Sequence, residues 1–232
     1  MSVGARVAAI IPAKAYSRRV PNKNVRLFHG KPLVVHTIEQ ALASETIDDV
    51  FVSTDDAEIA ALCERHGARV PFLRPLELSA NHVHGSAPIL DMLERLGGAS
   101  AYAYCVSLMP TSPLRRAATI DGVVRLAQQR QSNVISVAPS GRTAFHFRLL
   151  AADGGLRPLL PEHEGVFNVQ TDDLPEVYYL NALAHCAPVD ALLRHRTFQY
   201  GSPLAYQTDP VEAMDIDTER DFAIVERLAG LV

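Results

Sequence analysis

Short apolar runs alternate with amphipathic stretches along most of the chain. The first run, residues 7–11, contains no polar residue and is followed by Pro12, which cannot donate to a sheet ladder. Runs of this kind are typical of strands buried in a parallel sheet. Similar patterns predict further strands at 50–53, 68–72, 101–108, 133–137, 177–184 and 198–206.

Helical patterns fill the intervals between these strands. They predict helices at 32–43, 55–66, 86–96, 116–129, 189–193 and 217–230. Asp55 and Glu58 have capping-box spacing, and Ser86 can cap the helix that follows it. The β-α-β alternation predicts an α/β fold with a mostly parallel sheet, flanking helices and right-handed crossovers.

The alternation lapses between residues 139 and 175. Short β-like pieces at 145–149 and 165–169 flank Asp153-Gly154-Gly155, which predicts a hairpin turn. We interpret this segment as an arm outside the main sheet. The expected organisation is one domain, 1–232, with the arm inserted at about 139–176.

Composition narrows the class of protein. A net charge of −4 argues against general nucleic-acid binding, and no segment is long and apolar enough to span a membrane. The first residues lead directly into the first strand, so no signal peptide is expected. Cys63, Cys105 and Cys186 are odd in number and widely spaced, which fits a reducing cytoplasm.

The loop after the first strand is strongly basic. It contains no acidic residue, and its cations are Lys14, Arg18, Arg19, Lys23 and Arg26. Open α/β sheets bind ligands at the carboxyl ends of their strands. Five neighbouring cations repel each other unless an anion lies among them, so the loop indicates a nucleotide triphosphate site. The alternative is a solvated basic loop.

Two other segments carry candidate chemistry. Asp215 and Asp217 flank one residue, so in extended chain both carboxylates point to the same side and form an oxygen-donor pair suited to Mg²⁺. The alternative is that Asp217 only caps the last helix. Residues 110–115, PTSPLR, follow a buried strand and form either a wall of the same crevice or a helix entry capped by Ser112.

Several familiar motifs are absent from the sequence. No GxGxxG follows the first strand, and neither a GxxxxGK[ST] loop nor a GxSxG elbow is present. These absences count against a dinucleotide-binding oxidoreductase, a P-loop kinase and a hydrolase of the elbow type. His82 and His84 lack a third ligand at recognisable spacing, so a solvent-facing position is favoured over a metal site.

Taken together, the motifs resemble the N-acylneuraminate cytidylyltransferase family. The matching stretches are IIPAKAYSRRVPNKN at 10–24, VSTDD at 52–56, RPLELS at 74–79, PTSPLR at 110–115 and DIDTERDF at 215–222. Each is weak to moderate alone, but their order and spacing match across essentially the whole chain. The resemblance implies a Rossmann-like fold, dimerisation through the extended arm, and Mg²⁺-dependent transfer of CMP from CTP to an acidic sugar with release of pyrophosphate.

The resemblance also implies roles for individual residues. The nucleotide contacts would be Lys14, Ser17, Arg18, Lys23, Asn24, Arg74 and Ser86. Lys14, Lys23 and Asp217 would be catalytic, with Asp215 and Asp217 holding Mg²⁺. The acceptor contacts would be Met109, Thr111, Ser112, Arg115, Asn181 and Arg142, with Arg157 as a second candidate in the arm.

Departures from the family pattern concern mostly the acceptor. The family's loop usually has glycine near Ala15-Tyr16, Met109 stands where sialic-acid enzymes usually have Gln, and residues 180–183 depart from an NGAIY-like pattern. A thioether in place of an amide removes a hydrogen-bonding anchor. The expected acceptor is therefore a nonulosonate, with an octulosonate or a phosphonate as alternatives. A nucleotide-binding relative without turnover is the remaining alternative.

Overall fold

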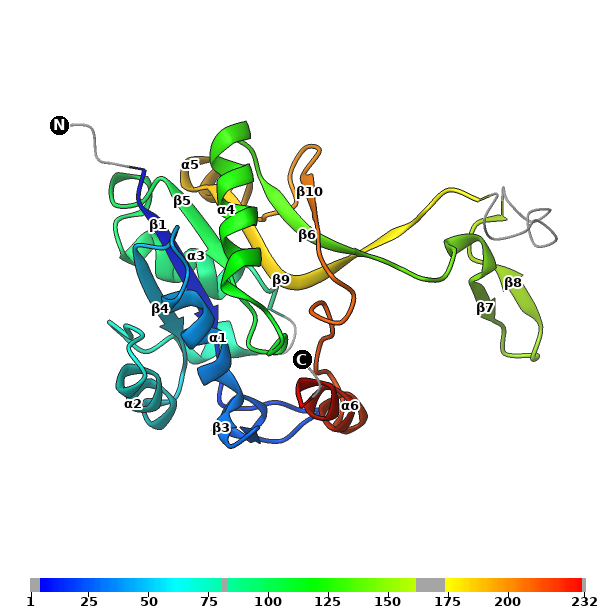
Figure 1. Cartoon of the computed structure of the whole chain (residues 1–232), viewed down its shortest axis with the longest axis horizontal. Helices are drawn as coiled ribbons and strands as arrows, with labels where there is room; N and C mark the ends of the chain where they lie inside the picture. Colours follow the sequence, from blue (N-terminus) through cyan, green and yellow to red (C-terminus); the bar gives the residue numbers. More distant parts are fainter. Residues whose placement is uncertain (1–4, 81–82, 162–173, 231–232) are drawn as a thin grey trace.

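The computed structural model describes residues 5–80, 83–161 and 174–230. One six-stranded sheet forms the body, in the order β10-β6-β9-β5-β1-β4 (Figure 1). Its strands are β1 (Val7–Pro12), β4 (Asp49–Ser53), β5 (Tyr104–Ser107), β6 (Val134–Pro139), β9 (Tyr178–Pro188) and β10 (Leu204–Gln207). All pairings are parallel except those of β9, which runs antiparallel to β5 and β6. The predicted Rossmann-like, mostly parallel architecture is confirmed.

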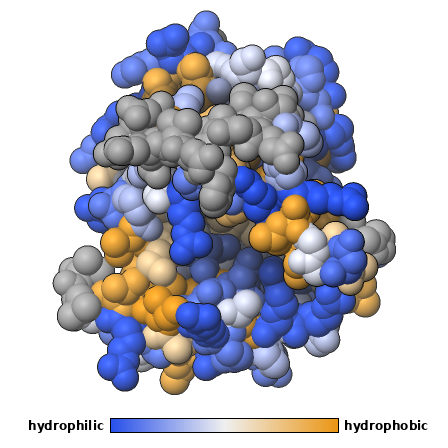
Figure 2. All heavy atoms as spheres, turned by 90° about the vertical axis from the view of Figure 1, so that its right-hand side faces the viewer, coloured by the Kyte–Doolittle hydropathy of each residue, from blue (hydrophilic) through white to orange (hydrophobic). Residues whose placement is uncertain are grey.

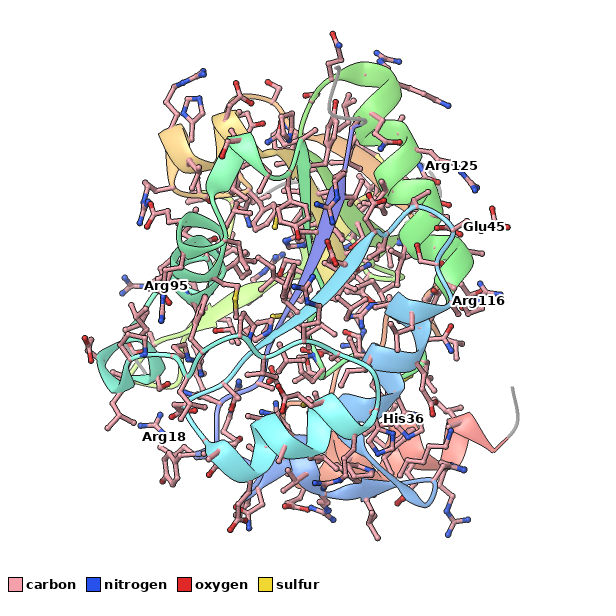
Figure 3. All side chains as sticks on the ribbon, turned by 90° about the vertical axis from the view of Figure 1, so that its left-hand side faces the viewer. Arg18, His36, Glu45, Arg95, Arg116 and Arg125 are labelled. Carbon is pink, nitrogen blue, oxygen red and sulfur yellow. The ribbon has the colours of Figure 1, made fainter. Side chains whose placement is uncertain are left out.

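Helices cover both faces of this sheet. They are α1 (Leu33–Leu42), α2 (Ala57–Arg65), α3 (Ala87–Arg95), α4 (Ala117–Arg130), α5 (Val189–His195) and α6 (Glu219–Ala229). Alternate residues of a strand face opposite sides, so Ala9 and Ile11 pack with α1 and α4, whereas Ala8 and Ile10 pack with α3 and α5. On the face covered by α1 and α4, Arg125 of α4 pairs with Glu45 at 2.6 Å (Figure 3).

Two predicted strands are shorter than the hydrophobic pattern suggests. The run at 68–72 makes only one bridge, from Phe51 to Arg69, because Pro71 has no N–H to extend a ladder. The run at 198–206 contains Gly201-Ser202-Pro203, and the strand forms only after it, as β10. In both cases backbone chemistry overrides the apolar pattern.

The prediction that Asp55 caps α2 is wrong. Asp56 is the cap, and its carboxylate accepts from the backbone N–H groups of Glu58 at 2.8 Å and Ile59 at 2.9 Å. Asp55 lies one residue earlier, where its side chain turns back and accepts from the backbone N–H of Ala15 at 2.9 Å. Asp55 therefore supports the basic loop instead of the helix.

Other helix starts differ by a few residues from the sequence pattern. Thr218, and not Asp217, is the cap of α6, within a capping box. The cap position of α4 is Arg116, so Ser112 lies outside that helix. Ser86 does occupy the cap position of α3, but its side chain makes no capping hydrogen bond. Asp217 and Ser112 are thus available for contacts other than helix capping.

The C-terminal segment is anchored beside the basic loop. Phe222 of α6 packs edge-on against Phe28, which lies in the short hairpin β2 (Leu27–Phe28) and β3 (Lys31–Pro32). Ile216 is buried in the same cluster and its N–H donates to the carbonyl of Thr111 at 2.8 Å. This packing places Asp215 and Asp217, on either side of Ile216, at the carboxyl ends of β1 and β5.

The arm projects from the body on a long extension of β6 and β9 (Figure 1). It carries the hairpin β7 (Arg148–Leu150) and β8 (Leu156–Pro158), and the predicted turn at 153–155 is confirmed by Gly154, whose φ is +84°. The predicted piece at 165–169 lies outside the described residues. Viewed from the arm side, orange apolar patches interrupt the polar surface (Figure 2). Within the described ranges, no helix has the length and apolar character needed to cross a bilayer.

Candidate active site

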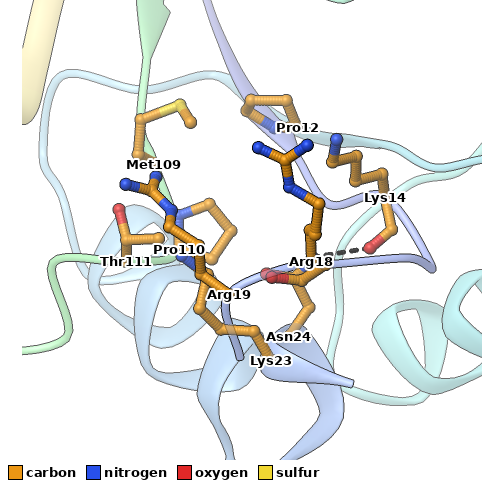
Figure 4. Close-up of a pocket in the computed structure, with 10 residues that line it drawn as sticks. Pro12, Lys14, Arg18, Arg19, Lys23, Asn24, Met109, Pro110 and Thr111 are labelled. Carbon is orange, nitrogen blue, oxygen red and sulfur yellow. Dashed lines mark hydrogen bonds between the residues drawn. The ribbon is translucent and has the colours of Figure 1, made fainter. Parts of the chain in front are cut away.

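The basic loop is held in shape by its own polar residues. The Asn24 side chain donates to the carbonyl of Lys14 at 2.8 Å, which closes the loop across ten residues (Figure 4). The backbone of Asn22 is left-handed, with a φ of +53°, and its carbonyl accepts from Val25 and Arg26 to begin a short 3₁₀ turn. Asn and Asp tolerate this conformation better than most residues. Internal hydrogen bonds therefore fix the conformation of the loop.

A cavity of about 330 Å³ lies inside this loop; we call it the first cavity. Its lining residues are Pro12, Lys14, Ser17, Arg18, Arg19, Lys23, Asn24, Met109, Pro110 and Thr111. Four are cations and, among the described residues, none that lines it is acidic. Arg18 reaches toward Lys14 on one side, and Arg19 reaches toward Met109 and Thr111 on the other (Figure 4). Such a lining suits a polyanion.

Lys23 is a largely enclosed cation of this lining, with a side chain that is 12% exposed. Its Nζ donates to the carbonyl of Ile216 at 2.7 Å and lies 3.8 Å from Oδ1 of Asp217. Burial lowers the pKa of Lys23, and the charges of Asp217 and Asp215 oppose that shift. The ammonium therefore lies between the cavity and two carboxylates.

Those two carboxylates lie behind the lining of the first cavity, where Asp217 contacts the lining residues Arg19 and Lys23. Asp217 Oδ1 accepts from Arg19 at 2.7 Å, and Asp215 Oδ1 accepts from the Ser112 hydroxyl at 3.3 Å. The described residues contain no group of three His, Cys, Asp or Glu side chains placed to hold a metal. Two carboxylates do fit Mg²⁺, however, because Mg²⁺ commonly takes one or two carboxylates and completes its shell with water and substrate phosphates.

A buried arginine lies behind the loop. Arg74 is only 5% exposed; its Nε donates to the Ser79 hydroxyl at 3.0 Å and its Nη2 lies 3.6 Å from Asp55 Oδ1. Nη2 has no hydrogen-bond partner among the described residues. Burial raises the pKa of Asp55, but hydrogen bonds from Ala15 and Ser79 and the charge of Arg74 outweigh it and hold that pKa low. A buried donor without an acceptor carries a desolvation penalty that a ligand can remove.

A second cavity, of about 210 Å³, shares one wall with the first. Its lining residues are His84, Gly85, Ser86, Ile89, Ser107, Met109, Ala182, His185, Thr197, Phe198 and Gln199. Met109 is the residue common to both linings. No described residue that lines the second cavity is Asp, Glu, Lys or Arg. A strongly cationic cavity thus adjoins a neutral, partly apolar one.

Arg115 does not reach either cavity. Its buried guanidinium donates to the carbonyls of Leu183 at 2.5 Å, Met109 at 2.7 Å and Ala182 at 3.1 Å, and to the Thr37 hydroxyl at 3.0 Å. Burial lowers its pKa to about 9, so it remains charged at neutral pH. The sequence-based expectation of an acceptor contact is corrected: Arg115 fixes the backbone of the cavity walls instead.

Two further expected acceptor residues also lie elsewhere. The amide of Asn181 is buried, accepting from Ser136 at 2.6 Å and donating to Thr208 at 2.9 Å, so it ties β9 to β6 and to the residue that follows β10. Arg142 lies at the base of the arm beside a separate surface depression. Within this chain, neither lines the two cavities. Of the expected acceptor residues, Met109 and Thr111 do line them, and Ser112 lies against Asp215.

Some lining residues were not identified from the sequence. The sequence identifies Arg19 only as one cation of the basic loop. It assigns no binding or catalytic role to four residues that line the second cavity: His185, Thr197, Phe198 and Gln199. His185 interrupts the apolar run at 182–188, which is the available signal. The segment 197–199 carried none, because it reads as part of a strand. His84 does line the second cavity, whereas His82 lies outside the described residues.

The chain is similar to proteins of one class. Residues 8–152 match the family model described as Cytidylyltransferase. A CMP-N,N'-diacetyllegionaminic acid synthase from Legionella pneumophila is 33% identical over 97% of this chain and 97% of that protein. An N-acylneuraminate cytidylyltransferase from Streptococcus agalactiae serotype V is 29% identical over 92% of this chain, which spans 51% of that longer protein.

The fold of this chain is also similar to that of solved cytidylyl-transferring enzymes. A CMP:2-keto-3-deoxy-manno-octonic acid synthetase complexed with CTP superposes with a TM-score of 0.71 at 14% identity, over 97% of this chain and 99% of that one. A 4-diphosphocytidyl-2C-methyl-D-erythritol synthase from Anaerococcus prevotii gives 0.65 at 12% identity, over 98% and 99%. The chain is a nucleotidyltransferase by class, and it belongs to the cytidylyltransferase family.

Proposed function

We propose that this enzyme transfers CMP from CTP to an acidic sugar of the nonulosonate type and releases pyrophosphate. The observation that carries the proposal is the meeting of a cationic cavity and a neutral cavity at Met109. The two relatives quoted above are named as a CMP-N,N'-diacetyllegionaminic acid synthase and an N-acylneuraminate cytidylyltransferase. A polyanionic nucleotide suits the first cavity and the sugar suits the second.

The triphosphate would bind in the first cavity. Lys14, Arg18, Arg19 and Lys23 supply the positive charge, and Ser17 and Asn24 line the same cavity. Arg74 supports a nucleotide contact because its Nη2 is a buried donor without an acceptor among the described residues. Ser86 lines the second cavity, so its expected nucleotide contact would be made from that side.

The chemistry is a displacement at the α-phosphorus. A hydroxyl oxygen of the acceptor forms the new P–O bond and its proton is released to solvent. The bond from the α-phosphorus to the bridging oxygen breaks, and pyrophosphate leaves with the electron pair. Little covalent chemistry is required of the protein, which contributes orientation and charge stabilisation. Lys23 would stabilise charge developing on the phosphate oxygens from its enclosed position next to the cavity. Lys14 would do the same from the opposite side.

A divalent metal ion, with Mg²⁺ as the expected ion, would be held by Asp215 and Asp217. Bound there, it would neutralise phosphate charge. Asp217 now faces Arg19 and Lys23, so the triphosphate would have to draw those cations toward itself as the site fills.

The arm would make a homodimer. Its hairpin exposes Leu149, Leu150 and Leu156, which a second copy of the arm would cover. A homodimer would also offer a route for the arm residues Arg142 and Arg157 to approach the partner's acceptor site, which they do not reach within their own chain. We treat residues 1–232 as one catalytic domain with this arm inserted at about 139–176. Free, buried cysteines and the use of CTP fit a cytoplasmic enzyme.

The test is pyrophosphate release with Mg²⁺. CTP, UTP, ATP and GTP would be assayed against N,N'-diacetyllegionaminic, pseudaminic and N-acetylneuraminic acids, an octulosonic acid and a phosphonate. Release with CTP and a nonulosonate is the expected result. Release only with an octulosonate or a phosphonate would replace the acceptor class, and CTP binding without release from any pair would refute the activity.

Two lysine variants assign the activity to the first cavity. Lys23→Ala is expected to lower the turnover number by about a hundredfold or more, because it removes a donor to developing charge. Lys31→Ala is the matched control, since Lys31 is exposed and pairs with Glu39 away from the cavity. Equal turnover by folded Lys23→Ala and the control would contradict the assigned role.

A further inference from the structure

His185 is a half-buried histidine in the wall of the second cavity. It lies on β9 close to Phe198, with the two ring centroids 6.2 Å apart. One ring nitrogen, Nε2, is 2.8 Å from the carbonyl oxygen of Asn181. A carbonyl only accepts, so Nε2 must carry the hydrogen in this contact. In the neutral ring Nδ1 is then an acceptor, and no residue of the described chain donates to it.

The surroundings of His185 favour the neutral ring. Burial lowers the pKa of His185, and the nearby charge of Arg115 lowers it further, although the contact with Asn181 acts in the opposite direction. Across the cavity the other titratable side chain is His84, and the described lining contains no carboxylate. Nothing on the described walls would draw a second proton onto the ring.

The rest of the cavity is apolar or lined by hydroxyls. Ile89, Met109, Ala182 and Phe198 form its apolar part, and Ser86, Ser107 and Thr197 contribute hydroxyl groups. A hydroxyl both donates and accepts, whereas Nδ1 of this tautomer only accepts. A group that binds against His185 must therefore carry an N–H or O–H, next to apolar atoms that fill the remaining space.

We propose that His185 determines acceptor specificity by accepting, at Nδ1, a hydrogen bond from an acylamino N–H or a hydroxyl of the acceptor. The proposal rests on the proposed function, because it takes the second cavity as the acceptor site. It adds that His185 is the residue that rejects acceptors lacking a donor at that position.

Kinetics of three variants test the proposal with one acceptor as the probe. N,N'-diacetyllegionaminic acid is the first choice, replaced by the panel acid that the wild type turns over best. His185→Phe keeps a ring but loses the acceptor, so KM for the acceptor should rise about tenfold, while KM for CTP stays within about twofold; tenfold corresponds to about 1.4 kcal/mol. His185→Gln retains an acceptor oxygen and should recover part of the loss.

The matched control is His36→Gln. His36 is also half-buried and its Nε2 also contacts a carbonyl, that of Phe28 at 2.8 Å, but it lines neither cavity. Its KM values should stay at the wild-type level. An unchanged acceptor KM in His185→Phe would overturn the proposal, and so would an equal rise in the KM for CTP, since that is the mark of a purely structural role.

Acceptor analogues identify the donor. An analogue with an ester in place of the acylamino group, and a deoxy analogue, each lack one candidate donor. The penalty of His185→Phe should disappear for one of them, and a penalty that persists with both would overturn the proposal. Failure of the proposed function is a different result, because the wild type itself would then release no pyrophosphate with any acidic sugar.

Discussion

Replacing Arg115 by methionine should destabilise the protein strongly. Arg115→Met introduces an apolar side chain of similar length and removes a guanidinium that donates to four acceptors. Three are backbone carbonyls of Met109, Ala182 and Leu183, and all four lie where the arginine is 2% exposed. Water cannot easily replace the donors in so enclosed a place.

The expected magnitude follows from the number of acceptors. A buried polar group left without its partner costs about 1–3 kcal/mol. We take the lower value for each of the four acceptors, which gives about 4 kcal/mol. Removing the desolvated charge offsets part of this loss, and about 3 kcal/mol remains. At this chain length each kcal/mol shifts the melting temperature by about 2–4 °C, so the expected fall is roughly 6–12 °C.

The assay is urea unfolding followed by circular dichroism, with Arg125→Met as the control. Arg125 lies on α4, its side chain is 51% exposed, and it pairs with the exposed carboxylate of Glu45 at 2.6 Å. An exposed pair of this kind is worth about 1 kcal/mol or less. Arg115→Lys should resemble Arg115→Met, because a single ammonium cannot replace a fork that serves four acceptors. If Arg115→Met loses no more stability than Arg125→Met, the reasoning is refuted.

Three other predictions concern separate parts of the molecule. Asp121 accepts three hydrogen bonds that outweigh burial and lower its pKa, so its contribution to the free energy of unfolding is present above about pH 4 and is lost as pH falls through the folded pKa. Asp121→Ala should lower the free energy of unfolding in urea by about 2 kcal/mol at pH 7. A difference from wild type that does not narrow by pH 3 would count against this account. Asp55→Asn removes the charge opposite Arg74 and should raise the KM for CTP severalfold in steady-state assays. The control Asp56→Asn retains the cap of α2 and should leave that KM unchanged. Equal KM values in both variants would contradict the role given to Asp55. Leu150→Glu places a charge on an arm side chain that is 74% exposed. For the proposed dimer, light scattering should show a dimer for the wild type and a monomer for the variant. A dimer retained in the variant would show that this residue is not in the interface.

Much of the fold was predictable because apolar runs and turn residues act locally. The strand over 7–11 and the turn at 153–155 were both identified correctly, and in each case the deciding chemistry lies within a few residues. The short strand at 68–72 was not, since a hydrophobic run does not show where Pro71 stops a ladder. The antiparallel direction of β9 also escaped prediction, because it follows from the arm returning the chain to the sheet.

The basic loop was the easier half of the site. The cations that line the first cavity all lie between residues 14 and 23. Their convergence on one cavity therefore requires only that the loop itself folds. The second cavity is assembled from four distant segments, around His84, Ser107, His185 and Thr197. No single pattern marks these segments as neighbours, and only the pairing of β5 with β9 brings two of them together.

Arg115 shows why residue type alone does not assign a role. The family resemblance implies an acceptor contact for Arg115. In the structure its donors fix the carbonyl of Met109, which separates the two cavities, and that of Ala182, which lines the second. The same guanidinium also lowers the pKa of His185. One buried cation thus positions the shared wall and favours the neutral histidine, so changes at Arg115 should affect acceptor binding without any contact to the acceptor.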